Sequence, residues 1–245
     1  MDVTLFVMKN NNGVQMINSP VKSNVNTKAK LWHCYNSRSL RALWVLEELG
    51  IDYEVETMSF PPRYTVDQYK KLNSLGTVPF FVDGKNGEIQ MTESVAICQY
   101  LGEKYQNEKN MILSVVDSEY GDYLNWLYHS DATLTFPQTI VLRYRTFAAK
   151  ESDQQQTAND YDAWFAARLT RLSDHLLHHH YLCEERFTIA DIVIGFSLHL
   201  ATLLKLDIHF SPQISAYLAR LKNRPAFQRA QAIGKELDPF ARNTI

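Results

Sequence analysis

The spacing of apolar and polar positions divides the chain into two parts that meet near residue 108. In the first part, short apolar runs alternate with stretches of helical spacing. Residues 30–35 predict a short strand, 37–49 a helix that ends at Gly50, and 51–58 a half-buried strand of alternating apolar and acidic positions. A short irregular helix is expected over 66–72.

Residues 77–91 have the pattern of a hairpin, with an apolar run, a turn that contains Asp83-Gly84, and a short return strand. Helical spacing resumes over 92–105. The resulting order, β-α-β-α-β-β-α over residues 30–107, predicts a small mixed sheet flanked by helices. This is the thioredoxin-like arrangement.

Strand signals stop after residue 107, so residues 108–245 are expected to form an all-helical domain. Pro137 should kink or interrupt the first long helix, and the polar stretch 150–160 is interpreted as a loop or as frayed helix ends before a helix over about 160–177. A later segment, beginning at Thr188, is apolar nearly all round and should be a buried helix. Thr188 and Asp191 have the spacing of its capping box.

Composition narrows the possible partners. A net charge of −2 and a pI near 6.4 argue against nucleic acid and an anionic membrane surface. The three cysteines are far apart, which argues against a disulfide framework and suits a reducing cytoplasm. No apolar run reaches the roughly 18–20 residues of a membrane helix. Residues 1–29, rich in Asn, Ser and Lys after a short apolar patch, predict a mostly irregular extension without a signal peptide.

Four motifs, in order, are "NSRSLRALWVLEELGIDYE", "LGTVPFFVDG", "MTESVAICQYL" and "RFTIADIVIGFSL", and "AYLARLKNRPAFQRA" follows near the end. Together they resemble the cytosolic glutathione S-transferases of the theta-like and bacterial or fungal types, over about residues 30–234. The resemblance implies a glutathione-binding first domain and a helical second domain.

The dipeptide Val78-Pro79 lies in the motif that resembles the family's cis-proline loop. Only an X-Pro bond becomes cis at a cost as low as about 0.5–1 kcal/mol. The resemblance implies a cis bond here, with the backbone of Val78 pairing with the cysteinyl backbone of glutathione like an added strand. Taken alone, the dipeptide also fits a trans proline at the start of an edge strand.

The dipeptide Glu93-Ser94 stands where a helix should begin. Free N–H groups and the hydroxyl of Ser94 suit a carboxylate, and Glu93 suits an ammonium group. The resemblance implies that both hold the γ-glutamyl end of glutathione. Plain helix capping is the alternative.

If the chain binds glutathione as the resemblance implies, the polar turn before the first helix has to stabilise the thiolate of glutathione. A free thiol has a pKa of about 8.5, and lowering this by two units takes about 2.7 kcal/mol. A hydroxyl at the positive end of a helix can donate to the sulfur. Ser37 stands four residues before Arg41, the spacing of the catalytic serine in theta-like members, so Ser37 is the first candidate and Tyr35 the second. Ser39 is interpreted as an internal or capping hydroxyl.

Two further features bear on the site. Many similar proteins carry Lys or Gln where this chain has Thr77, so the partner of the glycyl carboxylate is open, with Arg63, Lys70 and Lys71 as candidates. Cys34 lies too early for the catalytic cysteine of some relatives and is expected to be a buried structural thiol.

Three consecutive histidines, residues 178–180, point in different directions on any regular element, so no metal site is expected.

These observations predict a cytoplasmic glutathione transferase that conjugates glutathione to small hydrophobic electrophiles. Glutathione would be a co-substrate, with no cofactor or metal, and the family resemblance implies a homodimer. Two alternatives stay open: a non-catalytic binding or regulatory protein of the same fold, and a glutathione-dependent thiol reductase or peroxidase.

Overall fold

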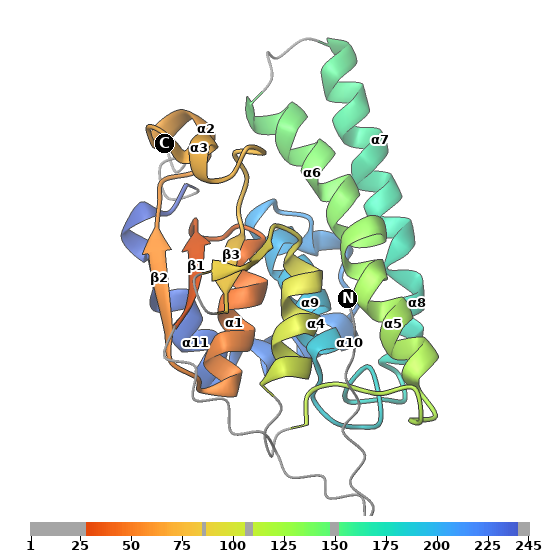
Figure 1. The fold of residues 1–245 in the computed structure, drawn as a ribbon. Helices are drawn as coiled ribbons and strands as arrows, with labels where there is room; N and C mark the ends of the chain where they lie inside the picture. The colour runs from red at the N-terminus through yellow and green to blue at the C-terminus, as the bar shows by residue number, and fades with distance from the viewer. Residues whose placement is uncertain (1–27, 85–86, 106–109, 148–151, 240–245) are drawn as a thin grey trace, which may run out of the picture.

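A mixed sheet of four strands lies at the centre of the first domain in the computed structural model, which describes residues 28–84, 87–105, 110–147 and 152–239 (Figure 1). The strands are β1 (Ala29–His33), β2 (Tyr53–Thr57), β3 (Phe80–Asp83) and β4 (Ile89–Met91). Their order is β2-β1-β3-β4, with β1 parallel to β2 and antiparallel to β3, and β3 antiparallel to β4. The extension expected over residues 1–29 lies almost entirely outside the described residues.

The helices of this domain are α1 (Ser39–Leu49), α2 (Pro62–Thr65), α3 (Tyr69–Leu72) and α4 (Ser94–Lys104). The predicted thioredoxin-like order is therefore confirmed. Gly50, at φ +66°, ends α1 as expected. Of the helix expected over 66–72, only α3 is present, because Val66 is extended and ends α2, and Gln68 is left-handed just before α3 begins.

The second domain is helical, as predicted. Its α-helices are α5 (Tyr120–Tyr128), α6 (Phe136–Leu142), α7 (Ser152–Arg168), α8 (Thr170–His175), α9 (Ile189–Leu203), α10 (Pro212–Lys222) and α11 (Pro225–Ala232). Two π-helical segments, η2 (His129–Thr135) and η3 (Arg143–Phe147), flank α6. Two 3₁₀ turns, η4 (Asp207–His209) and η5 (Lys235–Leu237), complete the set.

One expectation for this domain was wrong. The helix expected from about residue 160 begins at Ser152, so the described part of the polar stretch forms the first turns of α7. Glutamine and alanine favour helix, and Gln156 donates to Asp160 one turn later at 2.7 Å. The helix is long because it packs along α6, which a local pattern does not report. At Pro137, where a kink or interruption was expected, the helix continues but has just changed type: η2 ends at Thr135, and α6 begins at Phe136 with Pro137 in its first turn.

Helix α9 is the buried centre of the second domain. Its predicted capping box is present: the Asp191 carboxylate accepts from the Thr188 N–H at 2.7 Å. The same carboxylate accepts from the Tyr217 hydroxyl of α10 at 2.8 Å. The cap therefore fixes both the start of α9 and its packing on α10.

The two domains share a core through α1. Trp44, fully buried, packs against Phe187 and Phe227 of the second domain. On the same helix, Glu48 accepts two hydrogen bonds from the Arg224 guanidinium, at 2.6 and 3.0 Å. A smaller cluster on the other side of the sheet contains Trp32, Cys34, Met58, Tyr69, Val78 and Phe80. The segment from 34 to 41 thus lies between the sheet and the second domain.

Candidate functional site

The turn that carries Ser37 follows β1 directly. The Ser37 N–H donates to the Cys34 carbonyl at 3.2 Å, and Asn36, the third residue of this four-residue turn, has φ +55°. A left-handed residue at that position is typical of a type II turn, for which asparagine is one of the few suitable residues. Helix α1 begins two residues after Ser37, at Ser39, and its N-cap Arg38 makes no side-chain cap.

The side chain of Asn36 is held by the second domain. Its amide oxygen accepts from His199 Nε2 at 3.0 Å and from Gln231 Nε2 at 3.2 Å, and its nitrogen donates to Asp238 at 3.3 Å. All three partners lie on α9, α11 or just after η5. The conformation that places Ser37 therefore depends on contacts with residues more than 160 positions away. The left-handed turn signal of Asn36 was present in the sequence, but its partners were not.

Tyr35 points toward α11. Its hydroxyl donates to Gln231 Oε1 at 3.2 Å, and the residue is buried. Burial, with a further contribution from Asp238, raises the pKa of this phenol. Ser37, by contrast, is only partly buried. Its hydroxyl lies 2.8 Å from the Cys34 carbonyl and 2.7 Å from Ser39 Oγ.

The Val78-Pro79 bond is cis, as the resemblance implied. Strand β3 begins at Phe80, which pairs with Trp32, so the antiparallel register brings Val78 next to Cys34. The preceding carbonyl, that of Thr77, accepts from the Tyr69 hydroxyl and from Asn73 Nδ2, each at 2.8 Å. Among the described residues, no hydrogen-bond partner occurs for the backbone N–H or C=O of Val78. This backbone is therefore left for an extended ligand.

Ser94 is the first residue of α4, and Glu93 is its exposed N-cap. Arg41, four residues after Ser37, reaches Ser94 from α1. Its Nη1 donates to Ser94 Oγ at 3.0 Å and to Asp131 Oδ1 at 2.9 Å. Because Ser94 accepts this bond, its own hydroxyl hydrogen stays available to a ligand.

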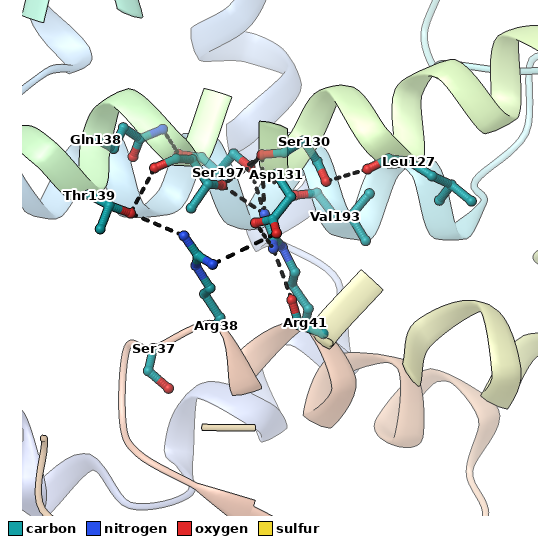
Figure 2. Close-up of polar contacts among 12 residues, drawn as sticks. Ser37, Arg38, Arg41, Leu127, Ser130, Asp131, Gln138, Thr139, Val193 and Ser197 are labelled. Atoms are coloured by element: carbon teal, nitrogen blue, oxygen red, sulfur yellow. Dashed lines mark hydrogen bonds and ion pairs between the residues drawn. The ribbon is translucent and has the colours of Figure 1, made fainter. Parts of the chain in front are cut away.

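Arg41 is fully buried where the two domains meet (Figure 2). Its second amino group, Nη2, donates to Thr135 Oγ1 at 2.8 Å, Ser197 Oγ at 3.1 Å and the Ser130 carbonyl at 3.3 Å. The partners come from η2 and α9. Burial by itself would raise the pKa of Asp131, but Arg41 and Arg38 outweigh it and hold that pKa below its usual value. This role of Arg41 was not foreseen in the sequence.

Arg38 spans from the turn to the second domain. It donates to Thr139 of α6 at 3.1 Å and lies 3.8 Å from Asp131. In Figure 2 both arginines point toward the second domain, whereas the Ser37 side chain points the other way, toward the sheet. Thus Ser37 is not covered by these ion pairs.

Three cations were candidates for the glycyl carboxylate, and all are exposed. A Cβ added at Gly76 would lie 2.7 Å from Arg63 Cβ and 3.5 Å from Lys70 Cε, which places these two side chains beside the loop that leads to Val78. Thr77 itself is exposed.

The cysteine thiols and the histidine run take no part in these hydrogen bonds, although the backbone of Cys34 does. Cys34, Cys98 and Cys183 are free and buried, as expected for structural thiols, and burial raises the pKa of each to about 12. Residues 178–180 are exposed after α8, and His179 lines a surface hollow of about 420 Å³ in the second domain. Within the described ranges, no three metal-ligating side chains come together.

Comparison with known proteins agrees with the fold described above. The family model "Glutathione S-transferase, N-terminal domain" matches residues 27–103. By this match, residues 27–103 are similar to a glutathione S-transferase N-terminal domain. Glutathione S-transferase 3 of Schizosaccharomyces pombe is 27% identical over 215 residues, covering 80% of this chain and 84% of that protein.

Two solved structures extend the likeness over both domains. The glutathione transferase URE2P8 from Phanerochaete chrysosporium, solved with oxidized glutathione, superposes with a TM-score of 0.75 at 19% identity, over 88% of this chain and 98% of that one. A glutathione transferase homologue from Lodderomyces elongisporus, with two GSH per subunit, gives 0.73 at 24% identity, over 84% and 99%. The chain therefore has the glutathione S-transferase fold. No helix in the described ranges is long and apolar enough to cross a membrane.

Proposed function

We propose that the chain is a glutathione transferase that lowers the pKa of the glutathione thiol with the hydroxyl of Ser37. The observation that carries this proposal is the position of three groups at one end of the sheet: the Ser37 hydroxyl after β1, the free Val78 backbone before β3, and Ser94 at the start of α4. They match the three parts of glutathione that need holding, namely the thiol, the cysteinyl backbone and the γ-glutamyl carboxylate.

Glutathione would bind with its cysteinyl backbone along Val78 and its γ-glutamyl carboxylate at Ser94 and the free N–H groups of α4. Glu93, exposed beside them, would pair with the ammonium group. On the opposite side, Lys70 and Arg63 would face the glycyl carboxylate. Two candidate binding residues are left out of this arrangement: Lys71, and Thr77, whose carbonyl is already engaged.

Ser37 is favoured over Tyr35 because the Tyr35 hydroxyl already donates to Gln231 and its ring is buried. In the reaction, a thiolate held near Ser37 would attack a small hydrophobic electrophile bound next to it, and the thiol proton would leave to solvent. Proximity of the two substrates would supply the rest of the acceleration. Two copies of the chain would pair, as the family resemblance implies, which sedimentation can measure.

The thiolate absorbance of bound glutathione, titrated against pH, tests the proposal. We expect a thiol pKa about two units below 8.5 in the wild type, and a return toward 8.5 in Ser37→Ala. Tyr35→Phe should keep the wild-type value. A wild type that neither binds immobilised glutathione nor converts an aromatic halide would instead support the non-catalytic alternative.

A further inference from the structure

Two residues beside Ser37 form a hydrogen-bonded chain that leads away from the ligand into the protein. His33 is the last residue of β1, and its Nδ1 lies 2.8 Å from Ser39 Oγ. Ser39 Oγ lies 2.7 Å from Ser37 Oγ. Both His33 and Ser39 are fully buried, so neither can touch a substrate.

We propose that His33 and Ser39 are positioning residues that direct the Ser37 hydroxyl hydrogen toward the glutathione sulfur. The inference rests on the proposed function, because it needs a thiolate beside Ser37. It adds to that function a reason why one hydroxyl of this turn, and not its neighbour, would face the ligand.

The direction of the hydrogen bonds from His33 through Ser39 to Ser37 follows from the donors available. Ser39 has a single hydroxyl hydrogen, and its oxygen accepts from the Cys34 N–H at 3.3 Å. When the imidazole carries its hydrogen on Nδ1, it donates to Ser39, and the Ser39 hydrogen can point to Ser37 Oγ. Ser37 Oγ also accepts from the Ser39 N–H at 3.3 Å. With two donors on its oxygen, Ser37 keeps its own hydrogen for a third partner.

The state of His33 fits this direction. Burial lowers the pKa of the imidazole to about 4, although the Ile233 backbone opposes part of that shift. The ring is therefore neutral at physiological pH and has one N–H. Nε2 is buried with no hydrogen-bond partner among the described residues. The proposed direction requires the ring hydrogen on Nδ1, since only then does His33 donate to Ser39.

Without ligand, Ser37 donates to the Cys34 carbonyl at 2.8 Å. Releasing that bond leaves the carbonyl satisfied, because the Ser37 N–H also donates to it at 3.2 Å. The hydroxyl can therefore rotate to the sulfur at little cost. No proton is transferred along the chain: the hydroxyls rotate, and the thiol proton goes to solvent. Donation to Ser37 Oγ strengthens the bond that Ser37 makes in turn.

The experiment compares the pKa of bound glutathione and the steady-state constants in single and double variants. Ser39→Ala should raise the thiol pKa by about 0.5–1 unit and lower kcat near pH 6.5 by about 2–6-fold, the fall in the thiolate fraction, with the KM for glutathione within about twofold. In a Ser37→Ala background the same substitution should have no further effect on the pKa. Arg38, the nearest charge on the helix start, is kept in every variant.

His33 provides the conservative rescue. The amide nitrogen of Asn occupies nearly the place of Nδ1, so His33→Asn should keep the low thiol pKa, whereas His33→Leu should shift it as Ser39→Ala does. Thr188→Ala, which removes a buried cap of α9 far from the turn, is the control for a general loss of stability. If Ser39→Ala does not fold, the Asn and Leu variants of His33 decide the question in the same way.

An unchanged thiol pKa in Ser39→Ala and in His33→Leu, with a wild type that does ionise glutathione, would overturn the positioning role of His33 and Ser39. It would leave the proposed function intact. A shift of equal size in the Ser37→Ala background would also overturn that positioning role, since the effect would then bypass Ser37. A wild type that does not lower the thiol pKa at all would overturn both.

Discussion

Arg41 donates to Ser94 at 3.0 Å and to Asp131 at 2.9 Å through the same amino group, so one buried guanidinium joins the start of α4 to the second domain. Three elements that are distant in the sequence meet at this side chain. The γ-glutamyl subsite proposed at Ser94 is therefore built on a contact between domains.

Removing this guanidinium should be costly. Arg41→Met would leave Asp131 without its buried donor, whereas the Ser130 carbonyl would keep the hydroxyls of Thr135 and Ser197, and we expect a loss of about 3 kcal/mol in the free energy of unfolding. This is the lower end of the usual range, because Asp131 is partly exposed and keeps Arg38. Arg38→Met, on the exposed partner of the same carboxylate, should cost less than about 1 kcal/mol. Urea denaturation measures both, and equal losses would contradict the assignment.

Close packing between α4 and α9 gives a second prediction. A Cβ at Gly102 of α4 would lie 2.4 Å from Ile189 Cδ1 and 2.6 Å from Ile112 Cγ2. Gly102→Ala should therefore destabilise the protein by about 1–3 kcal/mol through overpacking. At Gly121 of α5, a Cβ would meet nothing within 4 Å. Gly121→Ala should stabilise by about 0.5–1 kcal/mol through helix propensity. Thermal unfolding of the two variants should shift in opposite directions.

Two buried histidines predict how stability depends on pH. Burial lowers the pKa of His33 to about 4 and of His199 to about 3, against about 6.5 in the unfolded chain. Below pH 6.5 the histidines of the unfolded chain take up protons, whereas those of the folded protein do not. The free energy of unfolding is therefore highest above this pH and decreases as the pH falls toward 4. The loss is about 1.4 kcal/mol per pH unit for each histidine.

Protonation of Asp191 changes the free energy of unfolding in the opposite direction. Burial raises its pKa to about 6, so the folded protein gains stability from it as pH falls from about 6 to 4. The histidines outweigh it, and we expect a net loss of about 2–3 kcal/mol between pH 7 and 5. His199→Gln should reduce that difference by about 2 kcal/mol, whereas His178→Gln, an exposed site, should not. Urea titrations at the two pH values test this.

The glycyl carboxylate can be assigned by changing protein and ligand together. Lys70→Gln should weaken the binding of glutathione about tenfold, the loss of one bond between charged groups. It should leave the binding of the C-terminal amide of glutathione unchanged. Arg63→Gln should behave in the same way if both cations share the carboxylate, and Lys71→Gln serves as the control. Calorimetry with both ligands measures the difference, and an equal loss for acid and amide would rule out the assignment.

We expect the three buried cysteine thiols to react slowly with thiol reagents. A thiol reagent at pH 7.5 should label fewer than one cysteine per folded chain and all three after unfolding, because burial keeps each thiol protonated and covered. Incubation with oxidized glutathione should add no mass at Cys34. A stable mixed disulfide at that residue would instead support the thiol reductase alternative.

The sequence alone determined features whose causes lie within a few residues. Thr188 and Asp191 form the cap that their spacing predicts, and Gly50 ends α1. Short apolar runs and the alternating segment 51–58 give the strands at their correct places along the sequence. These features follow from backbone conformation and from burial of one face, which a local pattern records. The extent of α7 was misjudged, because its length depends on packing along α6.

Only the tertiary structure decided which way the side chains of the turn point. Tyr35 and Ser37 are near neighbours with hydroxyl groups, yet one faces α11 and the other lies beside Ser39. Arg41 meets Asp131 across 90 residues of sequence. Such directions are set by partners that folding brings together, and hydrogen-bond satisfaction in a buried site depends on all of them at once. The residue types were therefore readable from the sequence, and their roles followed from the packing of the second domain on α1.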